Sequence, residues 1–140
     1  MSMKRLAILG STGSIGANTL AVVDSQPDRF EVVALSADRQ VDRLFEQCRR
    51  YRPRYAAMAD AVAAGQLRLK VREAGLHCEV LSGAQAIEQL AAAPEVDAVM
   101  AAIVGAAGLR STLAAAYAGK QLLLANKEAL VMAGGLLMDA

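Results

Sequence analysis

Short apolar runs alternate with amphipathic segments along the whole sequence, and this alternation constrains the fold more than any other feature. The apolar runs predict strands at Leu6 to Leu9, Val32 to Leu35, Tyr55 to Met58, Glu79 to Leu81, Ala98 to Ala102 and Gln121 to Leu124. Segments of helical period follow them, at Ile15 to Ser25, Val41 to Tyr51, Ala59 to Ala74, Ala84 to Ala93, Leu109 to Ala118 and from Lys127 onward. Repeated units of this kind predict an α/β fold, a doubly wound parallel sheet of Rossmann type, with about six strands and helices on both faces.

Prolines and glycines mark the borders between these segments. Pro27, Pro53 and Pro94 each stand shortly before a predicted strand, where a missing N–H group breaks no helix. Gly75 and Gly119 follow predicted helices, so we expect them to end those helices in the left-handed conformation. Within the second helix the apolar residues recur at i, i+3, i+4 and i+7, which predicts a buried stripe. These residues are Val41, Leu44, Phe45 and Cys48.

Composition narrows the class of protein. The chain has 140 residues, enough for one domain, and it is 55% hydrophobic but only 4% aromatic, which favours a sheet covered by helices over a β-sandwich. The net charge is +1 and the basic segment Arg49 to Arg54 is interpreted as a solvated helix end, so we expect no nucleic-acid partner. No apolar run reaches the roughly 18 residues that cross a bilayer, so we expect no membrane association.

The two cysteines and the single histidine carry no recognisable catalytic or metal motif. Cys48 and Cys78 are far apart in the sequence and form no C-x-x-C motif, so we expect buried or inert thiols, as in a cytoplasmic protein, and no disulfide. His77 precedes a predicted strand and is expected in a loop or at an edge.

A glycine-rich segment joins the first predicted strand to the first predicted helix. Residues 10–16 read GSTGSIG, with the spacing G-x-x-G-x-x-G. Gly10 permits a tight turn, Gly13 lets a diphosphate approach the backbone, and Gly16 allows the helix to pack closely. We expect unpaired N–H groups of this turn to bind phosphate oxygens. The hydroxyl groups expected to assist belong to Ser11, Thr12 and Ser14.

One alternative to a dinucleotide site remains at this turn. The glycines could serve only to pack the helix against the strand. The turn is not a P-loop, because no Gly-Lys-Ser/Thr sequence follows at the required offset. ATP or GTP hydrolysis is therefore disfavoured.

The end of the second predicted strand bears on the choice of cofactor. An Asp or Glu about 20 residues beyond the last glycine would bind the ribose of NAD. Ser36 stands in that place, and Arg39 can reach a 2′-phosphate, which favours NADPH. Asp38 argues in the other direction unless it caps the following helix.

Three segments together resemble the 1-deoxy-D-xylulose 5-phosphate reductoisomerase family. They are AILGSTGSIG at 7–16, MAAIVGAAGL at 100–109 and LLANKEALV at 123–131. The resemblance covers essentially the whole chain, and the ANKE sequence is more specific than the glycines. It implies that residues 1–140 are the NADPH-binding domain, with catalytic, metal-binding and C-terminal domains absent from this chain. The uncapped apolar residues up to Ala140 agree with a chain that stops inside or just after a helix.

The resemblance also assigns roles to individual residues. The cofactor's phosphates would contact Thr12, Gly13, Ser14 and Ile15. Its adenosine end would be surrounded by Asp38, Arg39 and Gln40, where the family commonly has Gly-Lys-Asn or Gly-Arg-Asn. The nicotinamide half would lie near Ala102, Ile103, Asn126 and Glu128. Lys127 would reach the sugar-phosphate substrate, although Lys127 and Glu128 would also suit a charged pair on a surface helix.

The implied reaction rearranges deoxyxylulose phosphate and reduces the product with NADPH to 2-C-methyl-D-erythritol 4-phosphate, a step of non-mevalonate isoprenoid biosynthesis. A divalent cation, magnesium or manganese, would act as a Lewis acid, bound by residues outside this chain. The full-length protein is expected to be a homodimer, and the chain by itself is expected to catalyse nothing. Two alternatives remain: another dehydrogenase similar to the semialdehyde dehydrogenases, whose chemistry needs an activated cysteine, and a non-catalytic nucleotide-sensing module.

Overall fold

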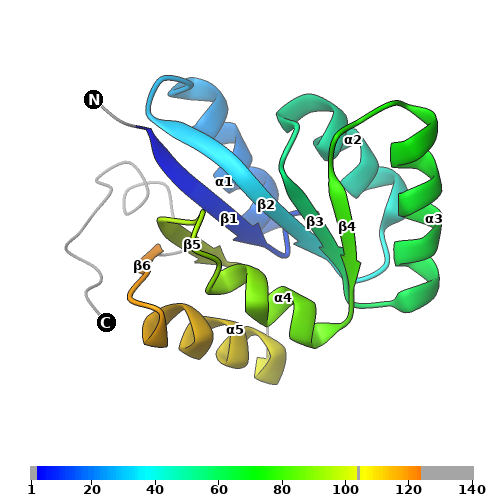
Figure 1. Ribbon diagram of the computed structural model, residues 1–140. Helices are drawn as coiled ribbons and strands as arrows, with labels where there is room; N and C mark the ends of the chain where they lie inside the picture. Colours follow the sequence, from blue (N-terminus) through cyan, green and yellow to red (C-terminus); the bar gives the residue numbers. More distant parts are fainter. Residues whose placement is uncertain (1–2, 104, 124–140) are drawn as a thin grey trace.

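The computed structural model describes residues 3–103 and 105–123, which form one six-stranded sheet with helices packed on it (Figure 1). The strands are β1 (Lys4–Leu9), β2 (Phe30–Ala37), β3 (Tyr55–Met58), β4 (Glu79–Ser82), β5 (Ala98–Ala101) and β6 (Gln121–Leu123). Their order across the sheet is β4-β3-β2-β1-β5-β6, and every neighbouring pair is parallel. The predicted Rossmann-type sheet is confirmed.

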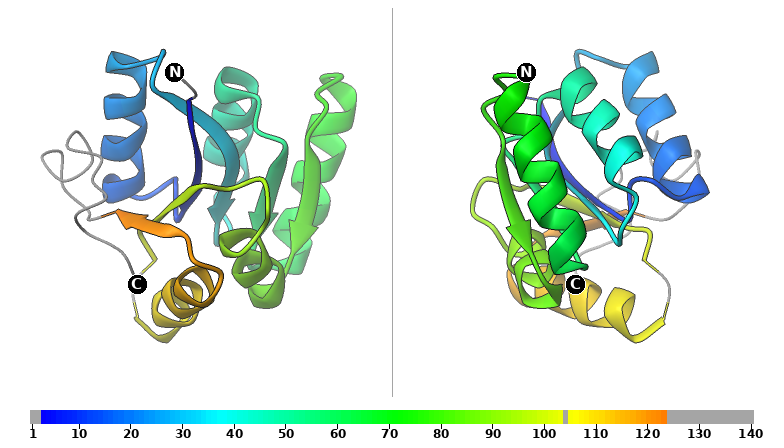
Figure 2. Two further views of the ribbon diagram at one scale, coloured as in Figure 1. Left: turned by 60° about the vertical axis from the view of Figure 1, so that its left-hand side comes forward. Right: turned by 90° about the vertical axis from the view of Figure 1, so that its right-hand side faces the viewer.

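The helices cover both faces of the sheet (Figure 2). One face carries α1 (Ser14–Ser25), α2 (Val41–Tyr51) and α3 (Ala61–Glu73), and the other carries α4 (Ala84–Ala91) and α5 (Gly105–Tyr117). The chain moves from β1 outward to β4 and then returns to the other side of β1 to form β5. Ligands of open parallel sheets bind at the carboxyl ends of the strands beside such a reversal, here between β1 and β5.

The central strand β1 contributes to the cores on both faces because successive side chains of a strand point in opposite directions. Leu6 and Ile8 belong to the core beneath α1, α2 and α3. Ala7 and Leu9 belong to the core beneath α4 and α5. All four side chains are fully buried, so the carboxyl end of β1 is held firmly from both sides.

The borders of the elements follow the predicted punctuation. Gly75 and Gly119 have φ of 69° and 74°, the left-handed conformation expected after a helix. In α2, Leu44 and Cys48 are buried and Val41 is half-buried, so the predicted apolar stripe is confirmed.

Three helices begin at other residues than predicted, and the first, α1, differs by one residue, since it begins at Ser14. Helix α3 begins at Ala61 and not at residue 59, because the Asp60 carboxylate accepts a hydrogen bond from the Ala63 N–H group at 2.9 Å and caps the helix. Helix α5 begins at Gly105, four residues before the predicted start at Leu109. Gly108 lies within the helix against the Ile103 carbonyl, where a side chain would collide with backbone. The helix predicted from Lys127 onward lies outside the described residues.

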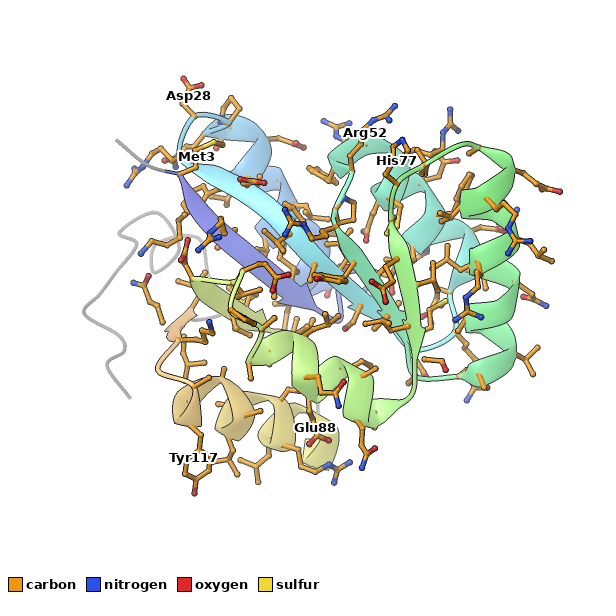
Figure 3. All side chains as sticks on the ribbon, viewed as in Figure 1. Met3, Asp28, Arg52, His77, Glu88 and Tyr117 are labelled. Carbon is orange, nitrogen blue, oxygen red and sulfur yellow. The ribbon has the colours of Figure 1, made fainter. Side chains whose placement is uncertain are left out.

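The surface of α5 carries an exposed apolar stripe. Leu109, Leu113 and Tyr117 recur every four residues along its outer side, and Tyr117 points away from the sheet (Figure 3). Within the described ranges, no helix is long and apolar enough to span a membrane.

The two cysteines lie together in the structure although they are far apart in the sequence. Both thiols are free; Cys48 is buried, and Cys78 packs against the same core just before β4. The interaction between the two thiols raises the pKa of Cys48 and lowers the pKa of Cys78. His77 is exposed in the loop before β4, as predicted (Figure 3).

Candidate functional site

A cavity of about 460 Å³ opens at the carboxyl ends of the central strands. Its wall combines the glycine turn after β1, the ends of β2 and β3, the segment after β5, and residues of α4 and α5. The lining residues are Gly10, Thr12, Gly13, Ser36, Ala37, Asp38, Gln40, Ala59, Ala84, Ile87, Glu88, Ala102, Ile103 and Ser111. The cavity therefore lies beside the reversal in strand order, where the topology places a ligand.

Glycine occupies the three positions of the turn for different structural reasons. Gly10 has φ of +81°, and a Cβ there would lie 2.9 Å from the Ala102 carbonyl oxygen. A Cβ on Gly16 would lie 2.5 Å from the Gly10 carbonyl oxygen, so α1 could not approach the turn. A Cβ on Gly13 would meet only that same oxygen, at 3.7 Å, and Gly13 is exposed. The fold thus requires glycine at 10 and 16, whereas glycine at 13 leaves space on the side that faces a ligand.

The backbone N–H groups of the turn divide into two sets. The Gly10 N–H donates to the Ser36 carbonyl at 3.1 Å and to Ser36 Oγ at 3.0 Å, and the Ser11 N–H donates to the Ser36 carbonyl at 2.8 Å. The Gly13 N–H donates to the Gly10 carbonyl at 3.3 Å. These three groups are not available to a ligand, so the prediction of unpaired N–H groups is wrong for Gly10, Ser11 and Gly13. Among the described residues, no acceptor meets the first-turn N–H groups of Ser14, Ile15 and Gly16.

The hydroxyl group of Ser11 is also engaged within the protein. Ser11 is fully buried, and its Oγ donates to the Ser36 carbonyl at 3.2 Å and to Gln47 Oε1 at 2.6 Å. The expected help from this hydroxyl in phosphate binding is therefore wrong. The Thr12 hydroxyl donates to Gln40 Oε1 at 3.4 Å near the surface, and Ser14 is exposed.

Helix α2 holds the turn through polar side chains that the sequence analysis did not identify. Gln47 Nε2 donates to the Ser11 carbonyl at 2.9 Å, and the Arg43 guanidinium donates to the Thr12 carbonyl at 3.3 Å. Gln40, Arg43 and Gln47 recur at i, i+3 and i+7 beside the apolar stripe. This spacing of polar residues could have indicated the contact with the turn from the sequence, because it places three hydrogen-bonding side chains on one side of the helix.

The end of β2 presents Asp38, Arg39 and Gln40 at the surface. The side chains of Asp38 and Arg39 are 62% and 74% exposed, and Arg39 Nε lies 3.7 Å from Asp38 Oδ2. Helix α2 has Gln40 at its N-cap position with no side-chain cap, so the suggestion that Asp38 caps this helix is wrong. Asp38 and Gln40 line the cavity, while Arg39 stands between them without forming part of its wall.

The remaining predicted residues divide between the described and undescribed parts of the chain. Ala102 and Ile103 follow β5 and line the cavity, and their place on the path of the nicotinamide stays a prediction. Asn126, Lys127 and Glu128 lie outside the described residues. The wall from α4 and α5 was not predicted, and it includes Glu88, whose carboxylate lies 3.4 Å from Arg110 (Figure 3).

Two pairs of groups with shifted pKa values lie at the amino ends of the strands, opposite the cavity. Hydrogen bonds from Arg5, at the start of β1, lower the pKa of Asp97, just before β5. The Tyr55 hydroxyl, at the start of β3, donates to Glu95, which raises the pKa of Tyr55 and lowers the pKa of Glu95. These shifts belong to pairs that connect the amino ends of the strands, far from the cavity. In residues 3–103 and 105–123, no three Asp, Glu, His or Cys side chains converge to hold a metal ion.

Residues 6–134 match the sequence profile of a family described as 1-deoxy-D-xylulose 5-phosphate reductoisomerase. The chain belongs to this family. The reductoisomerase of Methylococcus capsulatus is 66% identical over 137 residues, which cover 97% of this chain and 35% of that protein. The reductoisomerase of Nitrosomonas eutropha is 60% identical over 137 residues, which cover 98% of this chain and 33% of that protein. The chain thus spans about a third of the length of these reductoisomerases.

Solved reductoisomerase structures share the fold. One, in complex with NADPH, fosmidomycin and magnesium, is 48% identical with a TM-score of 0.84, covering 94% of this chain and 32% of its own. The Zymomonas mobilis reductoisomerase in complex with NADPH is 41% identical with a TM-score of 0.81, covering 96% of this chain and 35% of its own. The match to this family favours a reductoisomerase over a semialdehyde dehydrogenase.

Proposed function

We propose that this chain is the NADPH-binding domain of a 1-deoxy-D-xylulose 5-phosphate reductoisomerase. The observation that carries the proposal is the cavity beside β1 and β5, bordered by a turn whose following helix presents free N–H groups. Two solved relatives with the same fold are complexes with NADPH, which supports this choice of ligand.

The geometry suits a dinucleotide diphosphate. The N–H groups of Ser14, Ile15 and Gly16 and the positive end of the α1 dipole would bind its oxygens, and Gly13 has no side chain to displace them. Thr12 would lie beside the same phosphates. At the other end of the cavity, Arg39 would bind the 2′-phosphate between Asp38 and Gln40. Ala102 and Ile103 would line the path of the nicotinamide, which supplies a hydride when bound.

Three further roles stay proposals from the resemblance. Asn126 and Glu128 would lie near the nicotinamide, and Lys127 would contact the sugar-phosphate substrate. The segment that contains them follows β6 directly, and ligands of parallel sheets bind after the carboxyl ends of strands.

The whole protein would convert deoxyxylulose phosphate to 2-C-methyl-D-erythritol 4-phosphate for isoprenoid biosynthesis, as a cytoplasmic homodimer. Magnesium or manganese would be held by residues outside this chain, in agreement with the magnesium in two related structures. Fosmidomycin in a related complex supports a site for a small phosphate-like substrate. The chain by itself would bind cofactor and catalyse nothing.

The test is a turnover assay on a full-length protein that contains this chain. NADPH oxidation, followed by absorbance, should occur only when both deoxyxylulose phosphate and a divalent cation are present. Oxidation without either one would contradict the proposal. Binding of NADPH without any substrate-dependent oxidation would favour the nucleotide-sensing alternative.

A further inference from the structure

Gln47 of α2 makes two hydrogen bonds to one residue of the glycine turn. It accepts from Ser11 Oγ at 2.6 Å and donates from Nε2 to the Ser11 carbonyl at 2.9 Å. Ser11 is fully buried and Gln47 is half-buried, so these bonds are shielded from water. Two segments separated by 36 residues in the sequence are therefore joined at the first bend of the turn.

Ser11 contacts Ser36 on one side and Gln47 on the other, and the two contacts fix different parts of the turn. Ser36 occupies the N–H groups of Gly10 and Ser11, which fixes the entry to the turn. In the described part of the chain, Gln47 is the donor to the Ser11 carbonyl, so it sets the orientation of the peptide that leads into Thr12. Helix α1, with its free N–H groups, begins a few residues after this peptide. The direction of those N–H groups therefore depends on the orientation of the peptide.

The chemistry at Ser11 requires an amide side chain. Ser11 presents a hydroxyl donor and a carbonyl acceptor at the same time, and a glutamine offers both an acceptor and a donor. A carboxylate at position 47 could accept from the hydroxyl but would place a charged oxygen against the carbonyl. An alanine would leave the buried Ser11 carbonyl without a partner, which is costly, while the hydroxyl would keep only the Ser36 carbonyl at 3.2 Å.

We propose that Gln47 is a positioning residue that holds the glycine turn in the shape that binds the cofactor's diphosphate. This inference rests on the proposed NADPH-binding function. Gln47 would act through Ser11 and would not touch the nucleotide, so its effect should be confined to ligands that contain a diphosphate.

The experiment titrates a full-length protein that contains this chain with NADPH and, separately, with adenosine 2′-monophosphate, which lacks the diphosphate. The variants are Gln47→Ala, Gln47→Glu and a control, Gln66→Ala, which alters an exposed glutamine of α3. We expect Gln47→Ala and Gln47→Glu to weaken NADPH about tenfold and to change the monophosphate less than about twofold. Gln66→Ala should change neither affinity, and thermal denaturation shows that each variant is folded.

The outcomes separate this inference from the function on which it rests. A full-length wild-type protein that does not bind NADPH overturns the proposed function and the positioning role together. A full-length wild-type protein that binds NADPH, with both Gln47 variants binding equally well, overturns the positioning role alone. Equal losses for the two ligands also overturn it, because they would indicate a general structural effect. If Gln47→Ala does not fold, the near-isosteric Gln47→Glu decides by the same criteria.

Discussion

The two ends of the cavity differ in how firmly the protein holds them. The glycine turn is fixed by hydrogen bonds to Ser36 and Gln47 and by backbone contacts too close for a side chain at Gly16. The loop of Asp38 and Arg39 is exposed, and these two side chains form one ion pair at 3.7 Å. The end suited to the diphosphate, common to all dinucleotides, is thus part of the fold, whereas the end suited to the 2′-phosphate is a surface that can vary without loss of stability.

The largest effect is expected for Gly16→Ala, because the new methyl group would meet backbone atoms of Gly10 and Ser11 at 2.5 Å. We expect a loss of about 3 kcal/mol in the free energy of unfolding, measured by urea denaturation. A loss below about 1 kcal/mol would show that the turn can shift to accept the methyl group. The turn would then be held no more firmly than the loop of Asp38 and Arg39.

Gly13→Ala adds the same methyl group three residues earlier, but it should weaken cofactor binding and leave the stability almost unchanged. The free energy of unfolding should change by less than about 1 kcal/mol, because the nearest atom to the new methyl group lies at 3.7 Å. NADPH binding, measured by fluorescence titration, should weaken at least about tenfold, because the methyl group would occupy the place proposed for the diphosphate. Unchanged affinity would separate the turn from nucleotide binding.

At the exposed end, Arg39→Ala should affect selectivity and leave stability unchanged. We expect NADPH to bind about tenfold more weakly and NADH to change less than about twofold, because only NADPH carries the 2′-phosphate. Parallel titrations with both cofactors measure this difference. Arg72→Ala, at an exposed position on α3, is the matched control and should change neither affinity. Equal losses for both cofactors would show that Arg39 does not bind that phosphate.

The smallest effect is expected for Asp38→Gly, which restores a residue common in the family at this position. Removal of the carboxylate frees Arg39 from its ion pair and removes a negative charge near the position proposed for the 2′-phosphate. NADPH should bind about threefold more tightly at low salt, and the gain should shrink as ionic strength rises. A weaker affinity would mean that Asp38 contributes to the site.

The sequence predicted the sheet well because its signals are local. Strand β1, fully apolar from Leu6 to Leu9, and the glycines at 10, 13 and 16 stand next to one another in the chain, and their meaning depends on that spacing. The errors at Asp60 and Gly105 arose where one side chain or one close backbone contact decides where a helix begins. The roles predicted for Asn126, Lys127 and Glu128 stay predictions.

The wall of the cavity was harder to predict because it is assembled from distant segments. Ile87 of α4 and Ser111 of α5 reach the site only because the chain returns across the sheet between β4 and β5. The hydrogen bonds of Gln47 depend likewise on how α2 packs beside the turn. Such contacts join residues far apart in the chain, and no local pattern encodes their partners.

The position of β1 between β2 and β5 has a consequence for how the protein is made. A nascent chain can pair β1 with β2 soon after Ala37 leaves the ribosome, but Gly10 meets the Ala102 carbonyl only after β5 has been synthesised. NADPH would therefore find no finished site until the residues after β5 have been synthesised. It could stabilise the domain only from that point, after the slow long-range strand pairing is complete.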